Sequence, residues 1–371
     1  MDISNSAICI TAGEQSENHA GMEINGNGLS DKGFTIEELL DIKENLSLKG
    51  VECQYYCLNE YLPDKFKNDD KSKGQIAKAG ILFIRDGISK LTDFTGTQMF
   101  EEQIILDWDK QYWDTRRNKV LNKRARYNLC YSDENQLPDY QNKKGRIVSY
   151  KDLPILNQWR NKLSILFGKK AENLELEGNL YYDIKKCGIG FHGDGERKKV
   201  IACSLGGSRP IHWQWYHQNK PIGDRIKFSL NNGDIYIMSE KASGYDWKKR
   251  NKVTLRHAAG EKYVFKENSF KNLKKELGTY FGYPECCQDF FIEKRVMKKD
   301  LSLTQNQNKC KSNGFIPCPK CADYLVENNL KIVSLIKNRH CPHSFPTSYC
   351  YNLECSCVKP KSVLKKLQAN I

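Results

Sequence analysis

The stretch Gly188-Ile189-Gly190-Phe191-His192-Gly193-Asp194, near the middle of the chain, decides the expected fold. It has the pattern of a β-strand that ends in His-x-Asp. Residues two apart on a strand point to the same face, so the His192 imidazole and the Asp194 carboxylate can bind one metal ion together. With one more His from a distant strand they would form a two-His, one-carboxylate triad, which leaves open positions on a non-haem Fe(II) ion for an oxoacid and O₂.

Short strands follow this motif as far as about residue 265. The clearest are residues 200–205, 211–216, 226–230 and 234–238, separated by Gly, Pro and Asn. Strands that recur at a spacing of roughly ten residues are typical of a double-sheet jelly roll. Helices are expected at residues 35–48, with Thr35 as N-cap, at 100–109 and at 154–167. We therefore predict an α+β fold with a double-stranded β-helix (jelly roll) core, flanking helices and a small Cys-rich C-terminal domain.

The composition changes twice along the chain. Residues 1–33 are rich in Gly, Asn, Ser and Glu without an apolar period, so we expect a disordered tail. Residues 34–268 would form the main domain. Nine of the fifteen cysteines fall between Cys286 and Cys357, so residues 269–371 are expected to form a separate Cys-rich domain.

The charge of the chain favours an acidic partner. Its formal net charge is +14; the first 50 residues carry −6 and the rest carry +20. A basic body suits nucleic acid, although a Lys-rich coding bias would give the same excess. The sequence contains no long apolar run and no secretory signal, so we expect an intracellular protein, cytoplasmic or nuclear, with no membrane span. In such a reducing compartment the cysteines would be metal ligands or free thiols.

The region around residues 75–265 resembles the AlkB-like branch of the 2-oxoglutarate/Fe(II) dioxygenases. The resemblance rests on Tyr182, His192-x-Asp194, Glu196, Ser204-Leu205-Gly206 and Gly233-Asp234. It implies Fe(II) and 2-oxoglutarate as cofactors, with Tyr182 hydrogen-bonded to the oxoacid. It also implies oxidative dealkylation of modified nucleic-acid bases, as in DNA repair, with the base flipped into the pocket.

The third iron ligand departs from that family. No His lies between residues 233 and 250, where the family places one. His257 ends a strand 63 residues after Asp194 and is therefore the expected third ligand, with Asp246 as the next candidate.

The distal carboxylate of 2-oxoglutarate requires a cationic side chain in a dry pocket, ideally a bidentate Arg. Arg256 is the first candidate, with Arg250 and Lys262 in reserve. If His257 points inward, strand alternation turns Arg256 outward unless a bulge intervenes.

A basic segment upstream is the candidate nucleic-acid contact. Residues 125–132 are similar to the nucleotide-recognition lid of the AlkB-like family. A lid that binds phosphates and a solvated loop are equally compatible with its composition. Its candidate residues are Arg116, Arg117, Lys119, Lys123, Arg124, Arg126 and Tyr127.

Aromatic residues also alternate on the expected strand at residues 211–216. Trp213 and Trp215 share one face of that strand. They would either stack on a base or pack in the core.

The C-terminal cysteines include metal-ligand spacings. Cys318-x-x-Cys321 places two thiolates on one tight turn, as zinc knuckles do. A second pair would come from Cys286 and Cys287 or from Cys341 and His343. Zinc is the expected ion, while an iron–sulfur cluster or unligated thiols remain open.

The predicted activity is therefore a 2-oxoglutarate-dependent dioxygenase acting on alkylated DNA or RNA. One alternative is a prolyl or lysyl hydroxylase of proteins or peptides with the same iron site. The other is a nucleic-acid-binding protein that has lost its metal. The sequence leaves the oligomeric state and the modified base open.

Overall fold

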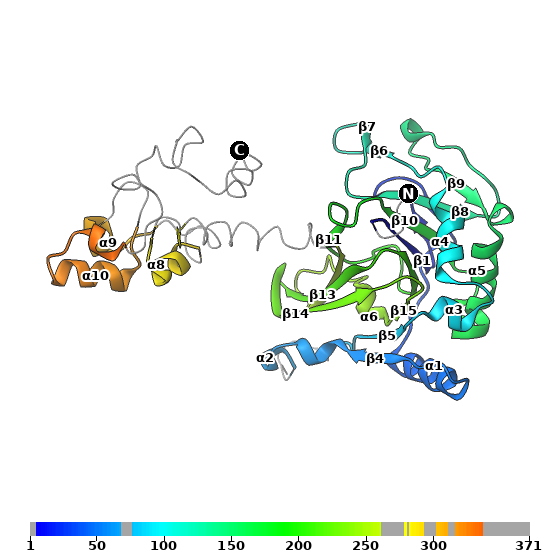
Figure 1. Ribbon diagram of the computed structural model, residues 1–371, viewed down its shortest axis with the longest axis horizontal. Helices are drawn as coiled ribbons and strands as arrows, with labels where there is room; N and C mark the ends of the chain where they lie inside the picture. Colours follow the sequence, from blue (N-terminus) through cyan, green and yellow to red (C-terminus); the bar gives the residue numbers. More distant parts are fainter. Residues whose placement is uncertain are drawn as a thin grey trace. The chain divides into compact units, whose positions relative to one another are not determined.

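The computed structural model describes residues 5–67, 76–260, 278–279, 282–292, 302–310 and 316–336. The chain divides into two compact units, Met1–Val264 and Phe265–Ile371, where the sequence predicted a boundary after residue 268. The first unit mixes α-helices with two large β-sheets (Figure 1). The α+β class is therefore as predicted.

The larger sheet of the first unit has eight strands in the order β4-β5-β15-β12-β1-β10-β8-β9. All neighbouring pairs are antiparallel except β8 and β9, which are parallel. The strands are β1 (Ala7–Gly13), β4 (Gln54–Cys57), β5 (Gly80–Ile84), β8 (Tyr127–Ser132), β9 (Ile147–Ser149), β10 (Glu175–Tyr181), β12 (Val200–Gly206) and β15 (Ile235–Met238).

The second sheet has four antiparallel strands in the order β11-β16-β13-β14. They are β11 (Ile189–His192), β13 (Arg209–His217), β14 (Lys220–Leu230) and β16 (Thr254–Ala259). Two small ribbons pair β2 (Ser16–Glu17) with β3 (Ile24–Asn25) and β6 (Gln111–Asp114) with β7 (Lys119–Asn122). The predicted strands at residues 200–238 are confirmed within a few residues.

Strand β1 overturns the prediction of a disordered tail over residues 1–33. It lies inside the larger sheet, hydrogen-bonded to β10 on one side and β12 on the other. Ile8 and Ile10 pack toward the helices, whereas Ala7 and Cys9 belong to the cluster that also holds residues of the second sheet. A strand buried on both faces shows a short continuous apolar run instead of alternation, and the polar residues around it hid this signal.

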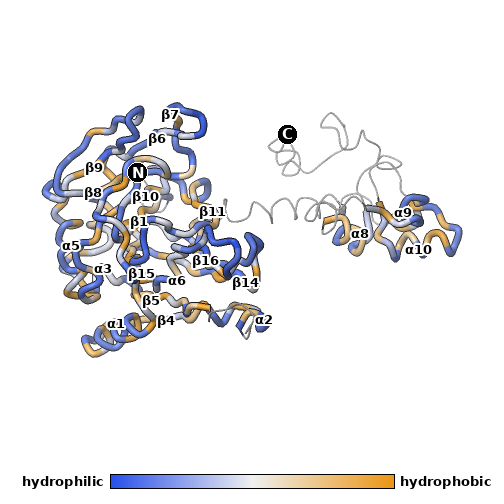
Figure 2. The backbone as a smooth tube through the Cα atoms, turned by 180° about the vertical axis from the view of Figure 1, so that it is seen from behind, coloured by the Kyte–Doolittle hydropathy of each residue, from blue (hydrophilic) through white to orange (hydrophobic). Residues whose placement is uncertain are grey.

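Helices cover the outer face of the larger sheet (Figure 1). Helix α1 (Ile36–Leu48) begins at the predicted cap, where Thr35 and Glu38 form a capping box. Helix α5 (Pro154–Phe167) matches its predicted range and buries Leu156, Trp159 and Leu163; Figure 2 shows hydrophobic and hydrophilic residues alternating along it. The predicted helix at 100–109 was misplaced, because α4 spans Gly96–Ile104 and starts at a capping box of Thr95 and Gln98.

Shorter helices complete the first unit. The α-helical ones are α2 (Asp64–Lys67), α3 (Gly87–Leu91) and α6 (Glu240–Ser243). The 3₁₀ turns are η1 (Leu58–Tyr61), η2 (Tyr140–Asn142), η3 (Tyr150–Asp152) and η4 (Lys169–Ala171).

A second core lies between the two sheets. Trp213 and Trp215 of β13 are fully buried in it, together with Phe83 of β5 and Tyr236 of β15. The indole N–H of Trp213 donates to the Ala242 carbonyl and that of Trp215 to the Leu58 carbonyl. These two Trp residues are therefore core residues, not a platform for a base.

The described part of the second unit is helical. It contains α8 (Glu285–Phe290), α9 (Gln305–Cys310), α10 (Pro319–Glu327) and the 3₁₀ turn η6 (Ile332–Leu335). Its apolar cluster is small: the buried Cys287 and Cys318, packed against Tyr283, Phe290, Cys321 and Ile332. Among the helices described in either unit, none has both the length and the apolar character needed to cross a bilayer.

Candidate metal centre

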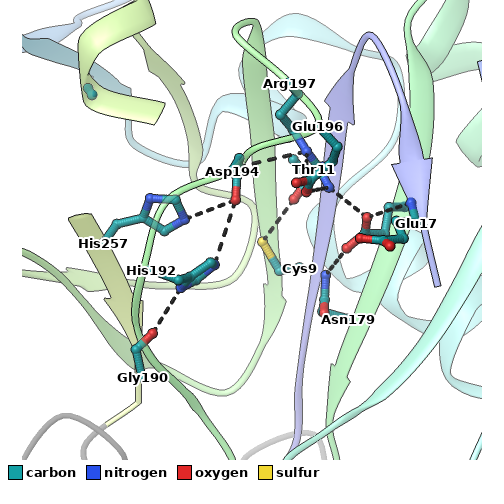
Figure 3. Close-up of polar contacts among 12 residues, drawn as sticks. Cys9, Thr11, Glu17, Asn179, Gly190, His192, Asp194, Glu196, Arg197 and His257 are labelled. Carbon is teal, nitrogen blue, oxygen red and sulfur yellow. Dashed lines mark hydrogen bonds and ion pairs between the residues drawn. The ribbon is translucent and has the colours of Figure 1, made fainter. Parts of the chain in front are cut away.

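The three residues expected to bind iron come together at one end of the smaller sheet (Figure 3). His192 ends β11, directly opposite His257 on the neighbouring strand β16. The Nε2 atoms of His192 and His257 lie 3.6 and 3.4 Å from the same oxygen, Oδ1 of Asp194. Two imidazoles and one carboxylate thus converge on a space of the size that a single metal ion occupies.

Two local features of the backbone place Asp194 beside the imidazoles. A register shift between Ile189 and His192 indicates a bulge in β11, which re-aims the end of that strand. The Asp194 amide then donates to the Ser243 carbonyl at 3.0 Å. A Cβ atom on Gly193 would lie 2.1 Å from the Gly244 carbonyl oxygen, so the residue between the two ligands must be glycine.

Hydrogen bonding fixes the tautomer of His192. Its Nδ1 lies 2.9 Å from the Gly190 carbonyl oxygen. A carbonyl can only accept, so Nδ1 carries the proton and Nε2 presents its lone pair toward Asp194. Burial, assisted by the nearby His257, lowers the pKa of His192 to about 3. The imidazole is therefore neutral at physiological pH, as a metal ligand must be.

A buried ion network supports the carboxylate from behind (Figure 3). Arg197 is only 3 % exposed. It donates to Glu177 at 2.7 Å and to Glu196 at 2.8 Å, and its Nε lies 3.8 Å from Oδ2 of Asp194. Burial by itself would raise the pKa of Asp194, but His257 and Arg197 outweigh it and hold the pKa below its usual range. Asp194 is thus ionised and oriented, with Oδ1 toward the imidazoles and Oδ2 toward Arg197.

These three candidate metal ligands line a cavity of about 550 Å³. Arg209, at the start of β13, lines the same cavity and is 2 % exposed. Its guanidinium lies over the Tyr181 ring, 4.5 Å from the ring centre. Its Nε and Nη1 find no hydrogen-bond partner within the described residues. A guanidinium with two unpaired nitrogens is costly to bury, so this one is suited to bind an anion in the cavity.

The residues predicted to bind the oxoacid lie elsewhere. Arg256 is turned away from His257 by the alternation of β16; its Nη2 donates to Asn219 at 2.7 Å, and its guanidinium stacks over the Tyr216 ring. Arg250 is exposed and is not part of the cavity lining. Arg256 and Arg250, the first two candidates for the oxoacid carboxylate, therefore do not line the cavity, which corrects both predictions. The third candidate, Lys262, falls outside the described residues.

Two further predictions need the same correction. The Tyr182 hydroxyl donates to the Arg124 carbonyl at 2.8 Å, and Tyr182 is not part of the cavity lining, unlike its neighbour Tyr181. Asp246, the reserve metal ligand, is buried in an ion pair with Lys241 at 2.7 Å. The prediction for Tyr182 failed because strand parity directs Tyr181, and not Tyr182, inward.

The basic segment borders a second recess of about 610 Å³, which we call the basic recess. Arg117, Lys123, Arg124 and Arg126 line it, and it shares His19 and Arg126 with the metal cavity. Among the predicted nucleic-acid contacts, Arg116, Arg117, Lys119 and Arg124 are exposed on or beside the β6–β7 ribbon. Tyr127 instead stacks on Tyr182, with ring centres 4.5 Å apart.

Lys123 is the exception in this set. It is buried, and its Nζ donates to the backbone and side-chain oxygens of Asn18 and to Oδ1 of Asn128. Burial lowers the pKa of Lys123 to about 7, although Asp109 opposes the shift. The prediction that Lys123 contacts phosphate is therefore wrong, because its Nζ is hydrogen-bonded to Asn18 and Asn128 inside the fold.

The cysteines of the second unit form a candidate metal group of their own. The Sγ atoms of Cys286, Cys287, Cys318 and Cys321 all lie within 4.8 Å of one another. The predicted ligands Cys341 and His343 fall outside the described residues. Both pairs that the sequence suggested, the adjacent one and the Cys-x-x-Cys one, are thus brought together.

Sequence reasoning missed Arg197, Glu177 and Arg209. Arg197 follows Asp194 by three residues, and a charged residue so close to a metal motif was an available signal. Arg209 begins a strongly apolar strand directly after Gly206-Gly207-Ser208, a position where a cation is unusual unless it binds something. Glu177 gave no signal of its own.

Comparisons with known proteins identify a relative but not an activity. No family model matches the chain. An uncharacterized protein of Acanthamoeba polyphaga mimivirus, named R156, is 43 % identical over 258 residues, which is 69 % of this chain and 97 % of the relative. Identity at this level over nearly the whole relative shows common descent: the chain belongs to the same protein family as the mimivirus protein.

Proposed function

We propose that the first unit is an Fe(II)- and 2-oxoglutarate-dependent dioxygenase. The observation that carries the proposal is the convergence of His192 and His257 on one oxygen of Asp194, at 3.6 and 3.4 Å, inside a cavity. Two imidazoles and one carboxylate are the donor set of non-haem Fe(II) oxygenases. Zinc also accepts these donors, but the buried Arg209 in the same cavity favours a site that takes an organic anion beside its metal.

The arrangement of strands supports a double-stranded β-helix for this unit. In such a jelly roll, eight strands form two four-stranded sheets that the chain visits in two interlocked Greek keys. Here β10, β12 and β15 alternate with strands β11, β13, β14 and β16 of the other sheet. We propose that β1 supplies the eighth strand, because it fills the place between β10 and β12. The closing strand would then come from the start of the chain instead of its end.

Arg209 is the proposed anchor for the distal carboxylate of 2-oxoglutarate. Its buried guanidinium has two nitrogens, Nε and Nη1, without partners among the described residues, and either can donate to a carboxylate. Tyr181 lies beneath it and Tyr236 lines the same cavity. Phenol rings exclude water around the pair and thereby strengthen it.

When bound, iron with 2-oxoglutarate and O₂ supplies the oxidising power that hydroxylates a substrate carbon. The protein's part is to position and to shield. Arg197 keeps Asp194 ionised and directs Oδ1 into the centre, the Gly190 carbonyl holds the His192 tautomer, and Arg209 orients the co-substrate.

An N-alkylated base in nucleic acid is the substrate we propose. The basic recess adjoins the metal cavity and shares Arg126 with it, so phosphates could be bound there while one base enters the cavity. Glu17 lines the cavity and would favour a cationic group, whereas Glu177 and Glu196 already pair with Arg197. Adenine alkylated at N1 and cytosine alkylated at N3 carry such a positive charge.

The Glu17 carboxylate also favours a second candidate. A lysyl side chain in a protein or peptide is also cationic and would suit this carboxylate. The two candidates differ at the basic recess. A phosphate backbone would bind to Arg117 and Arg124, whereas a cationic peptide would not.

Product analysis with the full-length protein tests the proposal. Fe(II), 2-oxoglutarate and N-methylated single-stranded DNA or RNA should give succinate and formaldehyde in equal amounts. His257→Ala should abolish both, whereas His217→Ala, on β13 but not in the cavity lining, should retain them. Succinate formed only with lysyl peptides would favour the second candidate. Absence of succinate with every substrate would contradict the dioxygenase proposal.

A further inference from the structure

We propose that Cys286, Cys287, Cys318 and Cys321 bind one zinc ion as a closed tetrathiolate site that holds the second unit together. The proposal is independent of the dioxygenase, because all four residues belong to the second unit. The ligands come in two pairs separated by thirty residues: an adjacent pair in α8 and a Cys-x-x-Cys pair at the start of α10.

The sulfur positions fit one ion. The Sγ atoms of Cys286 and Cys321 lie 3.5 Å apart, and all four Sγ atoms lie within 4.8 Å of one another. A disulfide would need about 2.05 Å. Zn–S bonds of about 2.3 Å in a tetrahedron place the sulfurs about 3.8 Å apart. The observed separations are therefore those of thiols gathered around a common centre, and they exceed those of a bonded pair.

The backbone supports ionised sulfurs at this place. Cys318 is the N-cap of α10, and its own amide donates to Sγ of Cys287 at 3.3 Å. Cys321 lies in the first turn of the same nine-residue helix, where unpaired backbone N–H groups favour negative charge. Amide-to-sulfur bonds of this kind stabilise the thiolates that a metal requires.

The packing of the second unit explains why an ion is needed. In its described part, two of the buried side chains of the apolar cluster are the ligands Cys287 and Cys318 themselves. Tyr283, Phe290 and Ile332 are only partly buried around them. A cluster of this size offers little burial energy, and small domains of this kind commonly depend on a structural metal.

Zinc is favoured over other metals by the ligand set and by its geometry. Four thiolates around one centre leave no open position, as in structural zinc sites. An iron–sulfur cluster binds its cysteines to several different iron atoms and therefore spreads the sulfurs more widely than one ion does. The close grouping of the four sulfurs thus indicates a mononuclear site with a structural role.

Metal analysis of the full-length chain, purified under reducing conditions, tests this site. Wild-type protein should carry one zinc per chain that survives His192→Ala, since that substitution affects only the first unit. Cys286→Ser should lose this zinc, and because the exposed Cys286 side chain is not part of the apolar cluster, any loss of structure in the second unit would come from the lost ion. Cys310→Ser is the matched control. Cys310 lies in the same unit but is not a member of the cluster, and its Sγ donates to the Ala322 carbonyl instead.

Cobalt substitution provides a second readout that does not depend on a variant. Co²⁺ bound to wild-type protein should show the intense thiolate-to-metal absorption of a tetrahedral tetrathiolate, and added zinc should remove it. Zinc retained in Cys286→Ser, iron with acid-labile sulfide, or a Cys286–Cys321 disulfide in protein kept under reducing conditions would each overturn the proposal. None of these results would bear on the iron centre, which is probed by His257→Ala.

Discussion

The metal cavity of the first unit and the cysteine cluster of the second are built in opposite ways. His192, Asp194 and His257 are positioned by paired strands, a buried ion network and apolar cores on both faces of the larger sheet. The four cysteines have a small apolar cluster of which they are themselves a part. In the first unit the fold creates the site, whereas in the second the site is expected to create the fold.

Removal of metal should separate the two units most clearly. A strong chelator should unfold the second unit, because structural zinc contributes on the order of 10 kcal/mol to the folding of small modules. The first unit should remain folded, since its cores do not involve the ion. Calorimetry of the full chain should then lose one transition and retain the other. Loss of both transitions, or of neither, would break the comparison.

Substitution of Arg197 should show that the buried ion network, and not a bound metal, supports the metal cavity. Arg197→Met leaves the buried Glu177 and the half-buried Glu196 without their cation. Breaking a buried ion pair from one side costs about 3–5 kcal/mol, and a lost supporting residue lowers metal affinity about 10–100-fold. Urea unfolding and Fe(II) titration measure the two effects.

Two controls sharpen that test. Arg250→Met removes an exposed arginine and should change neither the stability in urea nor the affinity for Fe(II). Adding Glu177→Gln to Arg197→Met should recover part of the lost stability, because it removes one of the unpaired charges. If Arg197→Met unfolded at the wild-type urea concentration, the ion network would not be the support described above.

The contrast between Arg209 and Arg256 gives the next largest effect. Arg209→Gln should weaken 2-oxoglutarate binding by roughly 100-fold, the equivalent of losing hydrogen bonds to a charged group worth about 1.5–3 kcal/mol. Arg256→Gln should leave the affinity unchanged, because that side chain bonds to Asn219 outside the cavity. Calorimetric titration of the iron-loaded protein distinguishes the two variants. A loss of affinity in Arg256→Gln and not in Arg209→Gln would make Arg256 the anchor instead.

Lys123 gives the smallest effect, on the pH dependence of stability. Burial lowers its pKa from 10.5 to about 7 in the folded chain. Between these values the unfolded chain binds a proton that the folded chain does not, so stability contributed by this residue rises with pH. Relative to Lys123→Met, the wild type should gain about 2 kcal/mol from pH 7 to pH 9. Urea unfolding measures the two proteins at both pH values. An equal change in unfolding free energy for the wild type and Lys123→Met would contradict the internal role of this lysine.

The sequence predicted those parts that depend on neighbouring residues. His192 and Asp194 share a face by strand parity, Thr35 caps its helix through Glu38, and α5 shows its apolar period directly. His257 came from elimination, and the structure places it with the other two. The cysteine pairs also followed from local spacing.

The errors concern partners that are distant in sequence. β1 is a strand only because β10 and β12 lie on either side of it, and no local pattern reveals that environment. Arg256 was the first candidate for the oxoacid carboxylate, but strand parity turned it outward because His257 points inward. Lys123 resembled a surface cation, but two of its hydrogen bonds go to Asn18, 105 residues away in the sequence.

Anaerobic titration with Fe(II) and 2-oxoglutarate tests the metal centre most directly. The full-length wild type and His217→Ala should both develop the visible metal-to-ligand charge-transfer band of a chelated oxoacid. His257→Ala should develop none at the same concentrations, because one of its three protein ligands is missing. A band of wild-type intensity in His257→Ala, or no band in the wild type, would contradict an iron centre built from His192, Asp194 and His257.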